Sequence, residues 1–268
     1  MALDYGYGAR IATPFQRPNF TESDEDLLSL LAVKITQCEL ARDRGYQISS
    51  QELPFLSEDG ITIPDFRAYL VLQQESIWRN NPSAPMARPR WLLTNSYYRI
   101  APNGRRMAML VYYGAAQSSS KSGLVDTSTI QQFTSTVINQ KRTMDQNINQ
   151  KTSLEHVILV VPTALNSDAG KHLAGFNTVP VTVYQDEELV YNPVYHVDTS
   201  GHQLLSAEEA AEVKVRLHMT NKDFLIAERT EPVVKYHGWP PLSILRVIRT
   251  DDEINLVVDH STNYRIVI

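Results

Sequence analysis

The sequence predicts a mixed α/β (α+β) protein, and three features lead to this expectation. The 268 residues are 43% hydrophobic and 21% charged, which is typical of a globular chain with a sizeable core and enough length for two domains. Residues 156–184 read as strand, helix and strand in succession, which predicts an α/β layer. Beyond residue 206, a capped helix is followed by short strands, which predicts a second, smaller α+β unit.

The N-terminal elements follow from periodicity and capping residues. Residues 1–22 are rich in Tyr, Gly, Arg and Pro and show no periodicity, so we expect a flexible or docking extension. Leu27–Leu40 carries apolar residues at three- and four-residue steps after the capping residue Ser23, which predicts a helix, and Gly45 suits a left-handed cap after it. A second short helix is expected to begin within 49–53.

A hairpin and a helix are expected next. Three prolines make residues 81–89 a loop. Two strands, 91–100 and 106–113, flank an Asn-Gly pair at 103–104, which is a strong hairpin signal. A long helical pattern covers 128–147.

The apolar β-branched run His156–Val161 predicts a central strand covered on both faces. Residues 167–173 and 179–184 predict a helix and a further strand. A change of composition near residue 191 places the boundary between the domains there.

The C-terminal domain is expected to begin with a helix that runs from Ser206 to about Leu217, because Ser206 and Glu209 form a capping box. Two strands are expected at 244–249 and 254–258, with 264–268 as a third candidate.

Charge is unevenly distributed along the chain. The net charge is −5, yet residues 76–125 hold seven basic residues and no acidic one. Arginines interleaved with aromatic residues suit phosphate contact and base stacking. The alternative is that the aromatic residues belong to core strands and the arginines meet an acidic neighbour. The candidate DNA-contact residues are Arg79, Arg88, Arg90, Arg99, Arg105 and Arg106.

Several classes of function are disfavoured. The single Cys38 excludes an internal disulfide and suits a packing role. With no secretory signal and no apolar run of membrane-spanning length, we expect an intracellular protein without membrane contact. Phosphate-binding glycine motifs and a nucleophile elbow are absent, which disfavours nucleotide hydrolysis and nucleophilic catalysis. We expect no cofactor and no small-molecule substrate.

Metal-dependent chemistry also lacks a complete set of residues. His196 and His202 lie close in sequence, but they do not form the paired ligand pattern of zinc sites, so we expect no metal. A metal-dependent nuclease would use a Pro-Asp pair followed by an acid-x-Lys on a neighbouring strand. Asp65 supplies the first part, but the match to the second, Glu212 to Lys214, falls on the late helix.

The C-terminal half resembles the shared subunit five of the eukaryotic nuclear RNA polymerases, whose assembly domain corresponds to a small separate subunit of the archaeal RNA polymerase. The segment 196–202 resembles the family's His-x5-His turn, and 231–238 resembles its Asp-Pro-Val-Ala-Arg-Tyr-Phe-Gly. Segments 205–209, 247–249 and 264–267 follow in family order. Upstream, 43–46 and 157–161 look like the family's jaw domain.

The resemblance implies a non-catalytic role in transcription. It implies a nuclease-like α/β jaw domain over 23–190, near downstream DNA, and an assembly domain over 191–268 that binds the largest polymerase subunit. It implies a location in the nucleus. The residues that match the assembly domain are His196, His202, Glu231, Pro232, Tyr236, Gly238, Arg249, Tyr264 and Arg265. Their simpler interpretation is maintenance of the fold.

Departures from the family pattern point to a specialised paralogue. Asp198 to Ser200 replaces the family's Leu-Val-Pro, and Pro240 to Leu242 replaces its Arg-Gly-Gln. We therefore expect a paralogue that serves one enzyme, with RNA polymerase I and the nucleolus as the leading expectation. The alternative is a freestanding nucleic-acid-binding module or an inactive nuclease relative.

Overall fold

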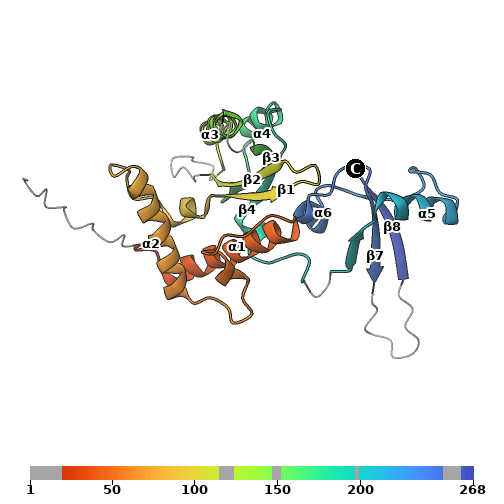
Figure 1. The fold of residues 1–268 in the computed structure, drawn as a ribbon, viewed down its shortest axis with the longest axis horizontal. Helices are drawn as coiled ribbons and strands as arrows, with labels where there is room; N and C mark the ends of the chain where they lie inside the picture. Colours follow the sequence, from red (N-terminus) through yellow and green to blue (C-terminus); the bar gives the residue numbers. More distant parts are fainter. Residues whose placement is uncertain (1–19, 115–123, 147–151, 197–198, 250–260) are drawn as a thin grey trace, which may run out of the picture.

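The structure, a computed structural model, describes residues 20–114, 124–146, 152–196, 199–249 and 261–268. The chain has mixed α and β content arranged around two small mixed sheets, which confirms the predicted α/β (α+β) class. Figure 1 shows the first sheet between helices and the second sheet at the far side of the molecule, beside the C-terminus.

Helix α1 (Asp24–Asp43) begins where the sequence predicts. The hydroxyl of Ser23 accepts a hydrogen bond from the backbone N–H of Asp26 at 3.2 Å, and three acidic residues in the first turn suit the positive end of the helix. After the helix, Gly45 adopts a φ of +80° and turns the chain away.

Two helical segments follow α1. The 3-10 helix η1 (Leu53–Leu56) replaces the short helix expected from residue 49, and it has a proline in its first turn. Helix α2 (Ile63–Asn80) was not predicted. It starts from a capping box in which Thr62 and Asp65 each bind the backbone N–H of the other.

The first sheet has the strand order β1-β2-β3-β4. The 3-10 helix η2 (Pro89–Leu93) leads into β1 (Asn95–Ile100), so the predicted strand 91–100 begins later than expected because Pro89 starts a helical turn. An Asn-Gly turn joins β1 to the antiparallel β2 (Arg106–Tyr113), as predicted. Parallel pairing then adds β3 (Thr152–Val161) and β4 (Val181–Gln185).

The predicted α/β layer forms around β3. Helix α3 (Thr127–Gln146) joins β2 to β3, and α4 (Ser167–Ala174) joins β3 to β4. Both helices pack on one face of the sheet, where side chains such as Leu110 and Leu159 meet Phe133. The other face packs on α1 and α2, so that the sheet is covered on both sides (Figure 1).

The second sheet has the order β5-β7-β8-β6. The connection from the first sheet includes the 3-10 helix η3 (Asp186–Leu189). The sheet contains β5 (Gly201–Leu204), β6 (Leu225–Ala227), β7 (Ile244–Arg249) and β8 (Ser261–Val267). Strand β7 has the predicted bounds, and β8 contains most of the third candidate strand; the strand expected at 254–258 lies outside the described residues, as do residues 1–19 of the predicted extension.

Two helices cover this second sheet. Helix α5 (Ala207–Leu217) starts from the predicted capping box of Ser206 and Glu209 and packs through Val213 onto Ile244 and Ile266. Helix α6 (Pro232–His237) packs through Val234 on the opposite face, beside Leu245. The two-domain boundary near 190 stays a prediction, because α6 also inserts a side chain into the core of the first half.

Candidate protein-docking site

A pocket of about 330 Å³ lies where the linking segment after residue 190 meets α6 and the second sheet. His202 from β5, Val247 from β7 and Arg265 from β8 supply its sheet wall. The remaining wall comes from the linking segment and the start of α6. The residues that line it are Tyr191, Pro193, His196, Thr199, Ser200, His202, Glu231, Pro232, Val233, Val247 and Arg265.

An ion pair crosses the pocket. Arg265 Nη1 donates to Glu231 Oε2 at 3.2 Å, and the Arg265 Nε atom is buried without a hydrogen-bond partner in the structure. Glu231 Oε1 in turn accepts from the backbone N–H of Glu228 at 3.0 Å, which fixes the carboxylate at the start of α6. A buried donor without a partner is costly, so the Arg265 Nε atom lowers the stability of this side of the pocket.

The linking segment is shaped by polar contacts of its own. Thr199 Oγ1 donates to the Pro193 carbonyl at 2.7 Å, and His202 Nδ1 lies 2.6 Å from the Ser200 carbonyl. A carbonyl only accepts, so the Nδ1–H of His202 donates in this contact. The rings of Tyr191 and His196 lie 5.6 Å apart. The pocket therefore offers aromatic, imidazole and hydroxyl groups with one internally balanced ion pair.

Five of the nine residues that the family resemblance marks in the C-terminal half come together in this pocket. They are His196, His202, Glu231, Pro232 and Arg265. The others lie elsewhere. Arg249 ends β7, and the Tyr264 hydroxyl accepts from Arg216 Nη2 at 3.1 Å on the side of α5. Tyr236 and Gly238 belong to the other end of α6.

That end of α6 ties the C-terminal half to α1. The Tyr236 side chain is fully buried in the core of the first half. Its hydroxyl donates to Asp43 Oδ2 at 2.8 Å and accepts from Asn192 Nδ2 at 2.9 Å. Burial, together with the hydrogen bond to Asp43 and its charge, raises the pKa of Tyr236 well above its ordinary value, so the phenol stays protonated. Burial also lowers the pKa of the neighbouring His237.

Two of the six candidate DNA-contact arginines are held by hydrogen bonds and ion pairs within the protein. Arg90 forms hydrogen bonds to both carboxylate oxygens of Asp186, at 2.7 and 3.0 Å, and also binds the backbone carbonyls of Gly114 and Val160. Arg99 is paired with Glu155. These contacts match the alternative interpretation of the basic block, in which an arginine meets an acidic neighbour.

The other four arginines lie in two separate places. Arg79 lies in the last turn of α2 and Arg88 precedes η2, whereas Arg105 and Arg106 lie at the hairpin, at the opposite end of β1. Arg106 stacks over the Tyr98 ring at 4.2 Å. The structure does not gather the six arginines into one surface.

The nuclease-type residues are not brought together either. Asp65 closes the capping box of α2, and Glu212 and Lys214 lie on α5, against the other sheet. Among the side chains that the structure describes, no three His, Cys, Asp or Glu residues are grouped so as to hold a metal ion.

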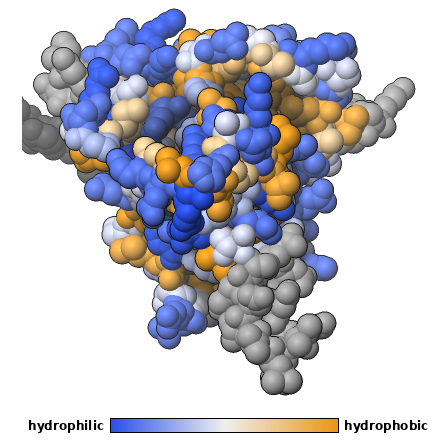
Figure 2. All heavy atoms as spheres, turned by 90° about the vertical axis from the view of Figure 1, so that its right-hand side faces the viewer, coloured by the Kyte–Doolittle hydropathy of each residue, from blue (hydrophilic) through white to orange (hydrophobic). Residues whose placement is uncertain are grey.

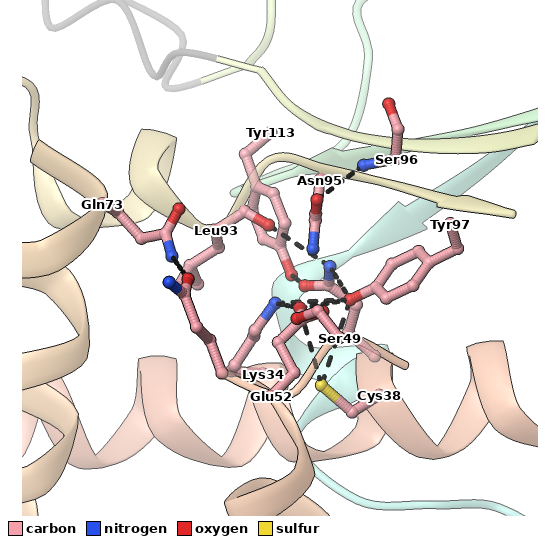
Figure 3. A network of polar contacts seen from close by, with 12 residues as sticks. Lys34, Cys38, Ser49, Glu52, Gln73, Leu93, Asn95, Ser96, Tyr97 and Tyr113 are labelled. Atoms are coloured by element: carbon pink, nitrogen blue, oxygen red, sulfur yellow. Dashed lines mark hydrogen bonds and ion pairs between the residues drawn. The ribbon is translucent and has the colours of Figure 1, made fainter. Parts of the chain in front are cut away.

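A buried polar network beneath the first sheet was missed in the sequence (Figure 3). Lys34 of α1 pairs with Glu52, and the Tyr97 hydroxyl donates to the same carboxylate at 2.8 Å. Gln37 joins the network by donating to Tyr97 at 2.8 Å and accepting from Tyr113 at 2.8 Å. Lys34 lies on the buried face with Leu27, Leu31 and Cys38, so helical spacing could have identified it.

Charge interactions within this network favour the charged forms of Lys34 and Glu52. Burial alone would lower the pKa of Lys34, but charge interactions with Tyr97 and Glu52 raise it well above its ordinary value. Burial would raise the pKa of Glu52, and the charge of Lys34 outweighs it, so that pKa lies below its usual range. Both side chains are shielded from solvent, so the network holds α1 against β1 and is not a binding site.

Neither a scan against models of protein families nor a search of curated proteins finds a match to this chain. Within the part of the chain that the structure describes, no helix is both long and apolar enough to cross a bilayer.

Proposed function

We propose that the chain is a non-catalytic structural subunit of a nuclear DNA-directed RNA polymerase, held to the largest subunit through the pocket at the start of α6. The single observation that supports this is the convergence of five residues, from segments 196–202, 231–232 and 265, on one pocket. At protein interfaces, anchoring side chains of one partner commonly fill pockets on the other.

The first sheet and its helices would then form the lower jaw near downstream DNA. Exposed Arg79, Arg88 and Arg105 are the residues that support this part of the proposal. Arg90 and Arg99 do not, since each is held by a carboxylate. A location in the nucleus, or in the nucleolus for a paralogue of RNA polymerase I, follows from the proposed partner.

The test is gentle affinity purification of the full-length tagged protein from nuclear extract, followed by mass spectrometry. We expect the largest subunit of one polymerase class at equal stoichiometry. A His196→Ala/His202→Ala variant should retain roughly tenfold less of it, as is typical when central interface residues are truncated. His172→Ala on α4 is the matched control, because His172 is exposed and lies on a helix that packs on the first sheet.

The outcomes separate the alternatives. Recovery of every polymerase class would contradict a specialised paralogue while supporting a shared subunit. Recovery of no polymerase, together with DNA binding by the purified chain, would favour the freestanding nucleic-acid-binding module or inactive nuclease relative.

A further inference from the structure

A second pocket lies at the end of the first sheet where β2 finishes. It has a volume of about 340 Å³. Helix α2 and the 3-10 helix η2 supply one side of it, Gln132 of α3 supplies the other, and Tyr112 comes from the end of β2. Figure 1 shows this end of the sheet between α2 and α3. Because β2, β3 and β4 run parallel, this is the carboxyl end of the strands, where open α/β sheets bind their ligands.

The lining of this pocket is rich in aromatic residues and carries no charged side chain. Trp91 is 42% exposed, and within the described residues its indole N–H has no hydrogen-bond partner. An exposed indole face offers a stacking surface to a planar ring. Gln73, Ser76 and Gln132 add amide and hydroxyl groups, which donate to and accept from polar atoms on the edge of such a ring. The lining therefore matches an uncharged planar ring with a polar edge.

Two arginines lie at the rim of the pocket. Arg88 precedes η2, and its carbonyl accepts from the Trp91 N–H at 2.9 Å, so the two residues are one tight turn apart. Arg79 follows Ser76 by three residues on α2, which makes them neighbours on the helix surface. Both arginines are exposed, and neither forms a hydrogen bond or an ion pair within the described residues. Positive charges beside an uncharged aromatic pocket match a ligand that joins an uncharged ring to anionic groups.

The two arginines meet at one pocket because the loop after α2 folds back onto the helix. The Ala87 N–H donates to Gln74 Oε1 at 2.7 Å, and the Trp78 indole N–H donates to the Ala84 carbonyl at 2.9 Å. These bonds hold the loop against α2, so the rim is fixed on both sides.

Size and charge decide between possible occupants. A volume of about 340 Å³ is near the lower end of ligand sites, which span about 300–1,000 Å³, and it suits one ring system. A paired base is stacked inside a duplex, so a base that enters the pocket must be unpaired. Free nucleotides are commonly held by a glycine-rich phosphate cradle, which the sequence lacks. Two separate arginines instead suit successive phosphates of one strand.

We propose that this pocket holds an unpaired base of a single-stranded nucleic acid, which stacks on Trp91 while Arg79 and Arg88 bind the neighbouring phosphates. The inference goes beyond the proposed function, which concerns duplex DNA and a protein partner at the start of α6. It does not depend on the polymerase assignment, because the residues that support it lie on α2, η2, β2 and α3.

The experiment measures binding of a short, fluorescently labelled oligothymidylate to the full-length protein by fluorescence anisotropy, beside the same strand paired with its complement. We expect the single strand to bind more tightly than the duplex. Trp91→Ala should weaken single-strand binding by roughly tenfold, as is typical when a stacking side chain is removed, and should leave duplex binding unchanged. Arg79→Gln/Arg88→Gln should lower the slope of log affinity against log salt by about 0.7 for each phosphate that is no longer bound.

Matched controls lie outside the pocket. Figure 2 faces the side of the molecule away from α2, where α5 and the second sheet lie, and shows exposed hydrophobic residues among hydrophilic ones. Arg216→Gln on α5 removes one exposed positive charge, as each of the two arginine substitutions does. Tyr195→Ala removes an aromatic side chain that is 65% exposed. Both controls should keep the wild-type affinity for the single strand.

Ser76→Leu keeps the inference falsifiable if the loss of Trp91 disturbs the fold. Ser76 is exposed on α2 and lines the pocket, so a leucine there fills space without removing a packed side chain. It should weaken single-strand binding as much as Trp91→Ala does, while the melting temperature stays unchanged.

Each outcome supports or overturns this inference. Preferential single-strand binding that Trp91→Ala and Ser76→Leu both weaken supports it. Absent single-strand binding, or binding that neither variant weakens, overturns it and leaves the polymerase proposal standing, because that proposal rests on the other pocket. Equal weakening of duplex binding also overturns it.

Two further arms test other occupants. Displacement of the strand by thymidine monophosphate at an equal concentration of nucleotide would identify a site for free nucleotides and overturn the strand. A photoreactive amino acid at position 91 that links to a protein in nuclear extract, with no single strand bound, would identify a protein site and overturn the inference.

Discussion

The guanidinium of Arg44 caps the C-terminal end of the helix that carries Tyr236. Arg44 Nε donates to the Tyr236 carbonyl and Nη2 to the Lys235 carbonyl, both at 2.8 Å. A helix leaves its last carbonyls without partners, and a planar fork of donors satisfies two of them at once. The contact joins residues 192 positions apart, so it fixes the C-terminal half onto α1.

Arg44→Lys should destabilise the protein by about 1–3 kcal/mol, because a lysine keeps the charge but cannot bind both carbonyls in the same geometry. Urea unfolding of the full chain measures the change. A midpoint equal to that of the wild type would show that the helix end is satisfied without the fork.

Gly238 should be coupled to Arg44. Gly238 has a φ of +64°, and a Cβ there would lie 2.9 Å from Arg44 Cζ. Gly238→Ala should cost about 2 kcal/mol from the left-handed conformation and the crowding. When Arg44 is also changed to alanine, the crowding should no longer contribute to the cost of Gly238→Ala. The double-mutant cycle should therefore give a coupling free energy of about 1 kcal/mol.

The control for this cycle is Gly104→Ala. Gly104 has a φ of +75°, and a Cβ added there would meet no other atom within 4 Å. The loss of stability in Gly104→Ala should therefore add to the loss in Arg44→Ala, without coupling. Additivity at both glycines would contradict the close contact between Arg44 and Gly238.

Local signals in the sequence predicted most elements but not the contacts between distant ones. Caps at Ser23 and Ser206 and the Asn-Gly turn define structure over a few residues, so α1, α5 and the hairpin could be placed. The contact of Arg44 with α6 and the meeting of His202 with Arg265 depend on packing and strand pairing. Single-sequence patterns do not encode these.

Helix α2 was missed because the residue that caps it, Asp65, was interpreted as part of a different feature. Thr62 and Asp65 are spaced as a capping box, and the box starts α2. In the sequence, Asp65 also fits half of a nuclease site, and that interpretation conceals the helix that it caps. The exposed position of Asp65 at the first turn of α2 explains that residue without catalysis.

Breaking the buried pair of Lys34 and Glu52 should be costly. Glu52→Gln leaves the Lys34 ammonium buried without a counter-charge and should destabilise by about 3–5 kcal/mol. The double variant Lys34→Met/Glu52→Leu should be less destabilised than Glu52→Gln, because no charge remains buried. Chemical denaturation measures both.

The matched surface pair is Asp168 and Lys171 on α4, both well exposed to solvent. Lys171→Met should change stability by less than about 0.5 kcal/mol. If Glu52→Gln behaved like this surface variant, Lys34 would have to be neutral or hydrated in the folded protein.

His156 should make the protein sensitive to acid. Burial, with the positive charges of Arg44 and Arg229, lowers the pKa of His156 from 6.5 to about 3. Between these values the unfolded chain binds a proton that the folded chain does not, so stability falls by about 1.4 kcal/mol per pH unit as the pH drops from 6.5 towards 3. Above pH 6.5 the group has no effect on stability.

The check is the pH dependence of stability in His156→Gln, whose amide can still bind Thr182, the partner of His156 Nε2 at 2.8 Å. The difference between wild type and variant should be flat above pH 6.5 and should shift against the wild type below it. A constant difference across this range would mean that His156 titrates normally in the folded state.

The arginines of the basic block should fall into two groups, one whose substitution leaves stability nearly unchanged and one whose substitution lowers it. Arg79, Arg88 and Arg105 are exposed, so changing all three to glutamine should alter stability by less than about 0.5 kcal/mol. Arg90→Gln should destabilise by about 2 kcal/mol, since it leaves Asp186 and two backbone carbonyls without their donor. Replacing all six together would therefore confuse unfolding with a failure to bind DNA.

Duplex binding by the exposed-site triple variant then tests the jaw proposal without that ambiguity. If these arginines contact phosphates, affinity should fall for every sequence, and the slope of log affinity against log salt should decrease by about 1 for each phosphate that is no longer bound. Arg142→Gln is a control outside the block, on α3. Unchanged affinity and slope in a fully folded triple variant would exclude DNA contact through Arg79, Arg88 and Arg105, and the basic block would then have to act on protein.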